Sequence, residues 1–561
     1  MVKKILTIFN REFTNTNEAA LLLGLFSLLS QFIGLLRDRS FAHMLGPSAS
    51  LDTYYAAFRI PDFLYASIAS LASITVLLPF LTKRLHGAEG ERGARVFMRD
   101  IFTAFFLLLV AISIGLFIAM PWLAKLIAPG FTDEAHHTLV FMSRIMLVSP
   151  IIFGISNMYG SVTQLYKKFF VYAIAPVFYN LGIIIGIFVF FPHFGLAGLA
   201  YGVVLGAALH FLVQLPVFIQ HKFVPTFHFP INWIRVREVV TLSLPRTLAL
   251  SLSQLSMLAL VALTSYLKEG SISIFSLSYN LETTTVMIVG ISYAVASFPI
   301  LSSLFTKGEK ALFSKHIFST ARSIIFWSIP MAVLFIVLRA QIVRVVFGSG
   351  AFSWSDTKLT AAALALFAIS VAAQSLVHLF VRAFYAAGNT TIPFLVNLAS
   401  ALITVGTATA LVAWYHFTPE VHYFIESLLR VDGISGTDIL MVPLGFSIGS
   451  IANCLLLGFF IHRRFGKTGK TGIGKTLLHV VGASVLMGAS AYAALSFFGT
   501  VFDLDTFVGI FAQGALAGII GTIIAALILF AVKNEEFLGF LNTVRTKFWK
   551  VKIVVPEQSD L

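Results

Sequence analysis

The chain has a single cysteine, Cys454, among its 561 residues. One cysteine excludes a disulfide framework and a cysteine-rich metal centre within the chain. Charged residues are also scarce, at 11% of the sequence, whereas 58% of the residues are hydrophobic and the mean hydropathy is +0.90. A soluble domain needs far more polar surface, so this composition indicates a polytopic membrane protein.

Catalytic signatures are largely missing as well. The sequence has no H-E-x-x-H motif and no Cys/His spacing typical of a metal site. The segment "GKTGIGKT" at 469–476 matches the phosphate-loop pattern, but such a loop follows a β-strand, and this one follows an apolar run and a basic stretch. The carboxylates are scattered and form no nucleophile–base constellation. We therefore expect a transporter rather than an enzyme, with no cofactor and no nucleic-acid partner.

Long apolar runs fill most of the chain, and a membrane-spanning helix needs about 20 such residues. The pattern predicts an all-α polytopic protein with fourteen transmembrane helices. The expected spans are 19–42, 54–82, 98–122, 137–160, 170–191, 194–220, 239–267, 272–304, 317–346, 357–386, 391–415, 437–462, 476–498 and 506–532.

Basic residues concentrate in alternate connections between these spans, and the formal net charge is +14. Lys83 and Arg84 lie in one basic connection and Arg463 and Arg464 in another, whereas connections such as "FPHFG" and "GTVFDLDT" have none. Cytoplasmic loops retain Lys and Arg, so the pattern predicts that both termini lie in the cytoplasm and that the basic residues face the anionic inner leaflet.

Two halves of the sequence share landmarks. Ser30-Gln31 is repeated at Ser253-Gln254, and the Pro-x-x-x-Asn pattern of Pro176 and Asn180 is repeated in the second half at 393–397. The offset covers six spans, which predicts two parallel six-helix lobes with a substrate site between them near the midplane. The expected domains are a cytoplasmic N-terminus (1–18), an N-lobe (19–222), a C-lobe (223–465), two extra spans (466–532) and a basic cytoplasmic tail (533–561).

Ionisable residues inside the spans are the candidate functional groups, because each costs roughly 2.5–3.5 kcal/mol at a helix centre. The set comprises Arg37, Asp38, Arg59, Arg246, Glu282 and Arg382, with Asp52 near the outer end of the second span. Residues 37, 38 and 39 project about 100° apart on a helix, so we expect Arg39 to reach the interface while Arg37 and Asp38 turn inward. The acids are candidate partners for Arg37 and Arg59, either as a structural ion-pair network or as a substrate and gating site. Arginine suits a phosphorylated or otherwise anionic amphiphile, whereas Glu282 keeps a cationic substrate open.

Several segments in order resemble the MurJ/MviN family of bacterial lipid II flippases, in the MATE-like exporter superfamily. They are "GLLRDRSFAHMLGPSASLDTYYAAFRIPDFL" (34–64), "PWLAKLIAPGF" (121–131), "YAIAPVFYN" (172–180), "QLP" (214–216), "RAFYAAGNTTIP" (382–393) and "LGFSIGSIANCLLL" (444–457). The resemblance implies alternating access and export of an undecaprenyl-diphosphate-linked disaccharide pentapeptide for peptidoglycan synthesis. It also implies a location in the bacterial inner membrane, contact with membrane lipids and the peptidoglycan-synthesis machinery, dependence on membrane potential and sodium coupling. Proton coupling through Glu282 or Asp38 is the alternative that the acids in the spans leave open.

The resemblance makes Arg37 a diphosphate contact and gives Asp38 and Asp52 gating positions. The chain departs from the family pattern where Gln31 and Asn280 replace arginines, and "LYASIASL" (64–71) lacks two basic residues. We predict substrate-binding residues Arg37, Arg59, Arg246, Gln31 and Asn280, and gating or ion-pair residues Asp38, Asp52, Glu282 and Arg382. The alternatives are a flippase for another polyprenyl-linked oligosaccharide, a cation-coupled small-molecule exporter and a non-transporting membrane scaffold.

Overall fold

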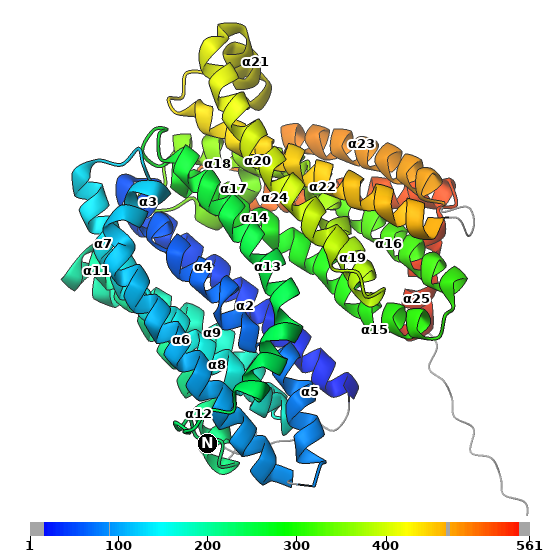
Figure 1. The fold of residues 1–561 in the computed structure, drawn as a ribbon. Helices are drawn as coiled ribbons and strands as arrows, with labels where there is room; N and C mark the ends of the chain where they lie inside the picture. The colour runs from blue at the N-terminus through cyan, green and yellow to red at the C-terminus, as the bar shows by residue number, and fades with distance from the viewer. Residues whose placement is uncertain (1–15, 89, 467–471, 549–561) are drawn as a thin grey trace, which may run out of the picture. The chain divides into compact units, whose positions relative to one another are not determined.

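The computed structural model describes residues 16–88, 90–466 and 472–548, and those residues form helices and turns with no β-strand among them (Figure 1). Ten helical segments in this described part are long and apolar enough to cross a membrane. An eleventh is added if Trp354–Ala368 and Val371–Ala386, which meet at a 45° bend, form one span. The all-α membrane fold is confirmed, and the count of fourteen spans stays a prediction.

The expected second span (54–82) is not one continuous helix in the structure. It is divided among α3 (Ala49–Ala57), α4 (Arg59–Ser67), the short 3₁₀ helix η1 (Ala69–Ala72) and α5 (Ile74–Leu85). None of these pieces reaches the length of about 20 residues that a single straight crossing requires. The apolar run is therefore present in the sequence, but the backbone uses it as a broken helix.

Tertiary packing divides the chain into two units that interleave along the sequence. Unit 1 comprises the described residues of Met1–Leu281, together with Val346–Ala363 and Thr390–Gly449. Unit 2 comprises Glu282–Val345, Leu364–Asn389 and the described residues of Ser450–Leu561. Four of the five boundaries fall inside helices, namely α14 (Ser271–Val286), α17 (Arg339–Phe347), α18 (Trp354–Ala368) and α22 (Met441–Phe465), and the fifth falls in the turn before Thr391. The two-lobe division expected from the sequence repeat stays a prediction.

Unit 1 contains most of the helices. In addition to α3, α4, η1 and α5 they are α2 (Thr16–Leu45), α6 (Gly90–Ile127), α7 (Asp133–Met146), α8 (Val148–Leu165), α9 (Phe169–Ile185), η2 (Gly186–Phe190), α10 (Phe191–Phe194), α11 (Leu196–Leu212), α12 (Leu215–Gln220), α13 (Trp233–Thr264), the larger part of α14 (Ser271–Val286) and of α18 (Trp354–Ala368), α20 (Thr391–Phe417), α21 (Pro419–Leu429), η4 (Thr437–Leu440) and the start of α22 (Met441–Phe465). Figure 1 shows α21 at the end of α20, the helix it follows and contacts.

Glycines allow α9 with η2 to approach α11 closely. Gly182 lies against Gly206 and Gly186 against Gly202, while Gly198 lies against the backbone of Phe190. The glycines of each segment are spaced four residues apart. A Cβ atom on Gly186 would lie 2.5 Å from the Cα of Gly202, and one on Gly202 would lie 2.6 Å from the Cα of Gly186. Lipid tails are as apolar as the helices, so membrane helices associate by close backbone packing of this kind. The sequence spacing of small residues therefore determines which face of α9 meets α11.

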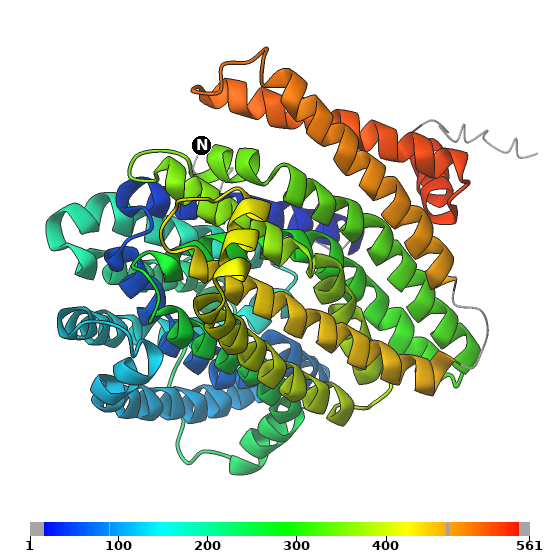
Figure 2. The same ribbon diagram turned by 90° about the horizontal axis from the view of Figure 1, so that it is seen from above.

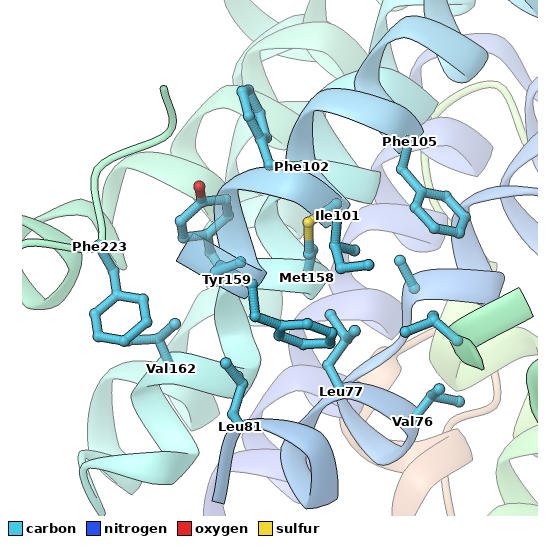
Figure 3. Packing of buried hydrophobic residues seen from close by; sticks show 14 of the residues in the cluster. Val76, Leu77, Leu81, Ile101, Phe102, Phe105, Met158, Tyr159, Val162 and Phe223 are labelled. Carbon is cyan, nitrogen blue, oxygen red and sulfur yellow. The ribbon is translucent and has the colours of Figure 1, made fainter. Parts of the chain in front are cut away.

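A large apolar core joins α5, α6 and α8 at another part of unit 1 (Figure 3). Leu77 and Leu81 on α5 are fully buried, and they lie one turn apart on the same face. The ring of Phe102 on α6 meets that of Tyr159 on α8 edge to face, with centroids 5.9 Å apart. Aromatic pairs favour this geometry because the positive ring edge meets the negative ring face.

Unit 2 comprises η3 (Met287–Ile291), α15 (Ser292–Thr306), α16 (Lys310–Val337), most of α17 (Arg339–Phe347), α19 (Val371–Ala386), the rest of α22, α23 (Ile473–Phe498), α24 (Phe507–Ala531) and α25 (Glu535–Phe548). Helices α23 and α24 pack side by side along their length (Figure 2).

The tail helix α25 is anchored to unit 2. Arg322 on α16 donates from Nε to an oxygen of Glu536 at 2.8 Å, and the Thr476 hydroxyl donates to the same oxygen at 3.1 Å. The ring of Phe540 meets Trp327 edge to face at 5.2 Å. The described part of the predicted basic tail is thus a docked helix.

Candidate functional site

A cavity of about 390 Å³ lies within unit 1, lined by α2, α3, α4, α9, α13 and α14. Its ionisable or amide-bearing lining side chains, other than tyrosines, are Arg37, Asp38, Arg59, Asp62, Gln254 and Asn280. Four tyrosines add hydroxyls and ring faces, namely Tyr54, Tyr55, Tyr179 and Tyr279. Three of the residues predicted to bind substrate (Arg37, Arg59 and Asn280) therefore share one cavity, together with the predicted gating residue Asp38.

Arg37 and Asp38 form the most saturated pair in this cavity. Arg37 donates from Nε and Nη2 to Asp38 Oδ1 at 2.9 and 2.7 Å, and from Nη1 to the Asn180 side-chain oxygen at 2.9 Å. Asn280 donates from its amide nitrogen to Asp38 Oδ2 at 3.0 Å. The buried Asp38 carboxylate is thus satisfied at both oxygens, and three of the five N–H donors of Arg37 are engaged.

Arg39, expected at the membrane interface, instead donates from Nη1 to the backbone carbonyl of Val346 at 2.9 Å. The carbonyl lies near the C-terminus of α17, where the last helical carbonyls lack partners within the helix. Of the three consecutive charged residues, Arg37 and Asp38 thus line the cavity, whereas Arg39 binds the C-terminal end of α17.

Arg59 is held much more loosely than Arg37. Its one recorded hydrogen bond runs from Nη2 to the Ser276 hydroxyl at 3.4 Å, near the upper limit for such a bond. Its Nε is buried and has no hydrogen-bond partner. Asp62 lies one turn later on α4 and also lines the cavity, so it shares a helix face with Arg59. Arg59 is therefore the cavity cation with the larger donor capacity left for a ligand.

Asp52 binds backbone rather than an arginine. One carboxylate oxygen accepts from the Gly270 N–H at 2.7 Å, and the other accepts from the N–H and the hydroxyl of Ser273 at 2.7 and 2.6 Å. The first backbone N–H groups of α14 have no partners within the helix, and a carboxylate is favoured at that end by the helix dipole. Asp52 on α3 therefore caps α14, the helix that carries Ser276 and Asn280 into the cavity.

The other predicted residues lie elsewhere. Gln31, on α2, is half-buried and is outside the cavity lining. The side chain of Arg246 lies outside the described residues. In unit 2, Glu282 is fully buried and accepts a hydrogen bond from Gln374 at 2.7 Å, and Arg382 donates from Nη1 to the His378 carbonyl at 3.3 Å.

Sequence reasoning missed several cavity residues. Asp62 could have been found from its spacing of three residues after Arg59. Asn180 and the Ser253-Gln254 pair were noted as repeat landmarks, and the structure places Ser253 and Gln254 in the cavity and Asn180 on Arg37. The tyrosines gave no sequence signal, because aromatic residues are common throughout a membrane protein.

The lining balances two cations, Arg37 and Arg59, against two acids, Asp38 and Asp62. Both oxygens of Asp38 accept hydrogen bonds from Arg37 and Asn280. The charged groups with fewer hydrogen bonds are therefore the guanidinium of Arg59 and the carboxylate of Asp62. Such a cavity can bind an anionic group through Arg59 and polar groups through the amides and tyrosines. Within the described residues, no group of three His, Cys, Asp or Glu side chains is placed to hold a metal ion.

Comparisons with known proteins identify the family to which the chain is similar. The family model "Lipid II flippase MurJ" matches residues 41–512. The lipid II flippase MurJ of Burkholderia cenocepacia is 25% identical over 492 residues, covering 86% of this chain and 91% of that protein.

Solved structures give the same fold. The structure "Lipid II flippase MurJ, inward closed conformation" superposes with a TM-score of 0.70 at 20% identity, covering 92% of this chain and 100% of that one. An inward-facing multidrug resistance MATE family transporter of the MOP superfamily superposes with a TM-score of 0.62 at 15% identity, covering 78% and 95%.

Proposed function

The chain belongs to the lipid II flippase MurJ family, and we propose that it moves lipid II, a polyprenyl-diphosphate-linked disaccharide pentapeptide, from the cytoplasmic to the outer leaflet. Family membership supports the substrate class, since the match covers most of the chain and the relative from Burkholderia cenocepacia carries that name. The chain is a multi-pass membrane protein by its apolar helices.

The observation that carries the proposal is the state of Arg59. Its guanidinium lies in the unit 1 cavity with a buried Nε that has no partner and one long hydrogen bond to Ser276. A planar guanidinium binds two phosphate oxygens at once, and these charge-assisted bonds are about twice as strong as neutral ones. We assign Arg59 as the diphosphate contact.

Arg37 has a different task in this proposal. Its hydrogen bonds to Asp38 and Asn180, with that of Asn280 to Asp38, connect α2 with α9 and α14. Arg37 therefore holds the cavity wall in shape and can contribute to the substrate only with its remaining donors. The family pattern would have made Arg37 the principal contact, whereas its hydrogen bonds to Asp38 and Asn180 here leave that role to Arg59.

Transport would proceed by alternating access, in which the polar head group enters the cavity while the polyprenyl tail stays in lipid. We place the protein in the bacterial cytoplasmic membrane with both termini in the cytoplasm, because basic residues concentrate in one set of connections. A head group that moves one net charge across this membrane exchanges about 2.3 kcal/mol per 100 mV with the membrane potential. The peptidoglycan-synthesis machinery is the expected consumer of the exported precursor.

A depletion-rescue experiment tests the function. A bacterium depleted of its own lipid II flippase should regain growth when it produces this chain, and should fail to do so with Arg59→Ala. Arg59→Lys should rescue partially, because an ammonium keeps the charge but loses the planar fork. Failure of the wild-type chain to rescue, at a normal level in the membrane, would count against the proposal.

The matched control is Arg144→Ala on α7. Arg144 donates from Nε to the Phe117 carbonyl at 3.0 Å and is not part of the cavity lining. The same truncation should leave rescue intact there. Membrane abundance of each variant, measured in parallel, separates loss of function from loss of protein.

A further inference from the structure

Glu282 is a buried carboxyl with little to stabilise a negative charge. It lies on α14 in unit 2 and is fully buried. Its Oε1 accepts one hydrogen bond, from the Gln374 amide nitrogen at 2.7 Å, and its Oε2 has no hydrogen-bond partner. The Gln374 nitrogen also donates to the Ser370 hydroxyl at 2.9 Å. One neutral donor on one oxygen leaves a buried carboxylate unsatisfied, so this conformation fits the neutral acid.

Ion pairing does not offset the burial. No ion pair is recorded for Glu282 within the described part of the chain, whereas Asp38, Asp100 and Glu536 each have an arginine partner. One turn along α14, Val286 packs in an apolar cluster with Ala332 of α16 and Val371 of α19.

The ionisable groups on the neighbouring helices of unit 2 lie at least one helical turn away from the residues that pack near Glu282. On α19, His378 and Arg382 follow Gln374 at intervals of four residues, on the same stripe of the helix. On α16, the ionisable residues are Lys310, Lys315, His316 and Arg322, at least ten residues from Ala332 and so about 15 Å or more along the helix. Tyr293 is the one such group on η3 and α15. His378 is therefore the neighbour whose titration must be distinguished from that of Glu282.

The donor set favours a proton over a metal cation. Hard cations are bound by several oxygen atoms, whereas the group that faces this carboxyl is an amide N–H donor. Glu282 also belongs to no cluster of three potential ligands among the described residues. A carboxyl that alternates between a buried neutral form and a hydrated ionised form needs only one proton and no further ligands.

We propose that Glu282 is a proton-binding site that couples transport to the movement of one proton. The inference rests on the proposed function. In the conformation seen here the acid is protonated. A conformation open to one side of the membrane would hydrate the carboxyl, which would release its proton to that side as the carboxylate forms. A conformation open to the other side would let the carboxylate take up a proton there, so that one proton crosses the membrane in each cycle.

The position of Glu282 on α14 connects this site with the substrate cavity. Asn280 lies two residues earlier on the same helix, where it binds Asp38 in the cavity. The π-helix η3 follows α14 directly, and π-helical turns are frequent at functional sites in helices. Within unit 2, Gly290 of η3 packs against α19 so closely that a Cβ there would lie 2.5 Å from the Ser375 Cα. Protonation of Glu282 can thus change the conformation of α14, the helix that also carries the cavity residue Asn280.

Two measurements on purified full-length protein test the proposal. The first is infrared difference spectroscopy across a pH titration, which reads the carbonyl stretch of a protonated carboxyl directly and needs no substrate. The second is lipid II translocation in proteoliposomes with and without an inward or outward pH gradient. Both use wild type, Glu282→Gln, His378→Gln and a matched control, Glu426→Gln. Glu426 is also buried, but His422 and Thr437 occupy its Oε1 at 2.8 and 2.6 Å.

We expect a protonated-carboxyl band in wild type that Glu282→Gln removes, and a pH-gradient stimulation of translocation that the same variant loses. Both should persist in Glu426→Gln and His378→Gln. The proposal is overturned if the band survives in Glu282→Gln, or if translocation by wild type ignores the pH gradient or follows a sodium gradient instead. A wild type that carries the Glu282 band but moves no lipid II would contradict the proposed function and leave the proton site intact.

Discussion

Arg37 donates two hydrogen bonds to one oxygen of its neighbour Asp38, from Nε at 2.9 Å and from Nη2 at 2.7 Å. Consecutive residues on a helix normally point about 100° apart, so the long arginine side chain must fold back to reach the carboxylate. The other Asp38 oxygen accepts from Asn280. The pair therefore acts as one unit that fixes α2 against α14 rather than as two independent charges.

Asp38→Asn should impair lipid II translocation to about the same extent as Arg37→Ala, and the double variant should be no worse than either. The reason is that both changes break the same interaction, and hydrogen bonds to charged groups contribute about 1.5–3 kcal/mol each. Translocation in proteoliposomes and thermal unfolding in detergent are the measurements. Effects that simply add would show that the two residues act separately.

Asp52→Ala should lower the thermal stability of the protein. It removes the acceptor for two backbone N–H groups, of Gly270 and Ser273, in a buried location. Each buried donor left unpaired costs about 1–3 kcal/mol. The matched change Asp356→Ala removes a half-buried carboxylate whose hydrogen bond from Ser353 is exposed at the start of α18, where water can replace it, and it should matter much less. Equal melting temperatures for the two variants would contradict the capping role of Asp52.

Gly202→Ala should reduce the yield of folded protein, because the new Cβ would lie 2.6 Å from the Cα of Gly186 and would push α11 away from α9. Overpacking of this kind typically costs about 1–3 kcal/mol. Gly115→Ala is the control, since nothing lies within 4 Å of a Cβ at that position of α6. Monodispersity on size-exclusion chromatography and thermal unfolding compare the two. A stabilised Gly202→Ala protein would refute the close approach of the helices.

Asp100→Ala should loosen the connection between α12 and α13. Asp100 is fully buried on α6, where it binds His228 Nδ1 and Arg235 Nη1, each at 2.7 Å. Removing it leaves both partners without their acceptor. Each charge-assisted hydrogen bond lost should lower the free energy of unfolding by about 1.5–3 kcal/mol, and by less for Arg235, which is partly exposed. Limited proteolysis should cut residues 221–232 faster in this variant.

Glu238→Ala provides the comparison for that experiment. Its ion pair with Arg84 is 3.6 Å long and half-exposed, so it should contribute less than about 1 kcal/mol. Cleavage of the same connection at the wild-type rate in Asp100→Ala would show that the buried carboxylate does not restrain it.

The sequence predicted the all-helical membrane fold and three of the charged cavity residues, because both leave strong local signals. Apolar runs give helices, and a charge inside such a run must turn toward a partner, as Arg37 and Asp38 do. The division of 54–82 into short helices was not predictable, since hydropathy measures composition and not the course of the backbone.

Partner choice was harder to predict than position. Asp52 was expected beside an arginine, but it lies at the start of α14, where backbone N–H groups compete for it. Arg59 and Arg37 looked equivalent in the sequence, and only the hydrogen bonds distinguish the firmly held Arg37 from the loosely held Arg59. Such differences depend on contacts between residues far apart in the chain.

Lipid II translocation by purified protein in proteoliposomes, compared between wild type, Arg59→Ala and Arg144→Ala, tests the assignment of the cavity most directly. Wild type and Arg144→Ala should translocate lipid II at similar rates, and Arg59→Ala should lose at least about tenfold, the equivalent of one charge-assisted hydrogen bond. Translocation by Arg59→Ala at the wild-type rate would contradict the assignment of Arg59 as the diphosphate contact.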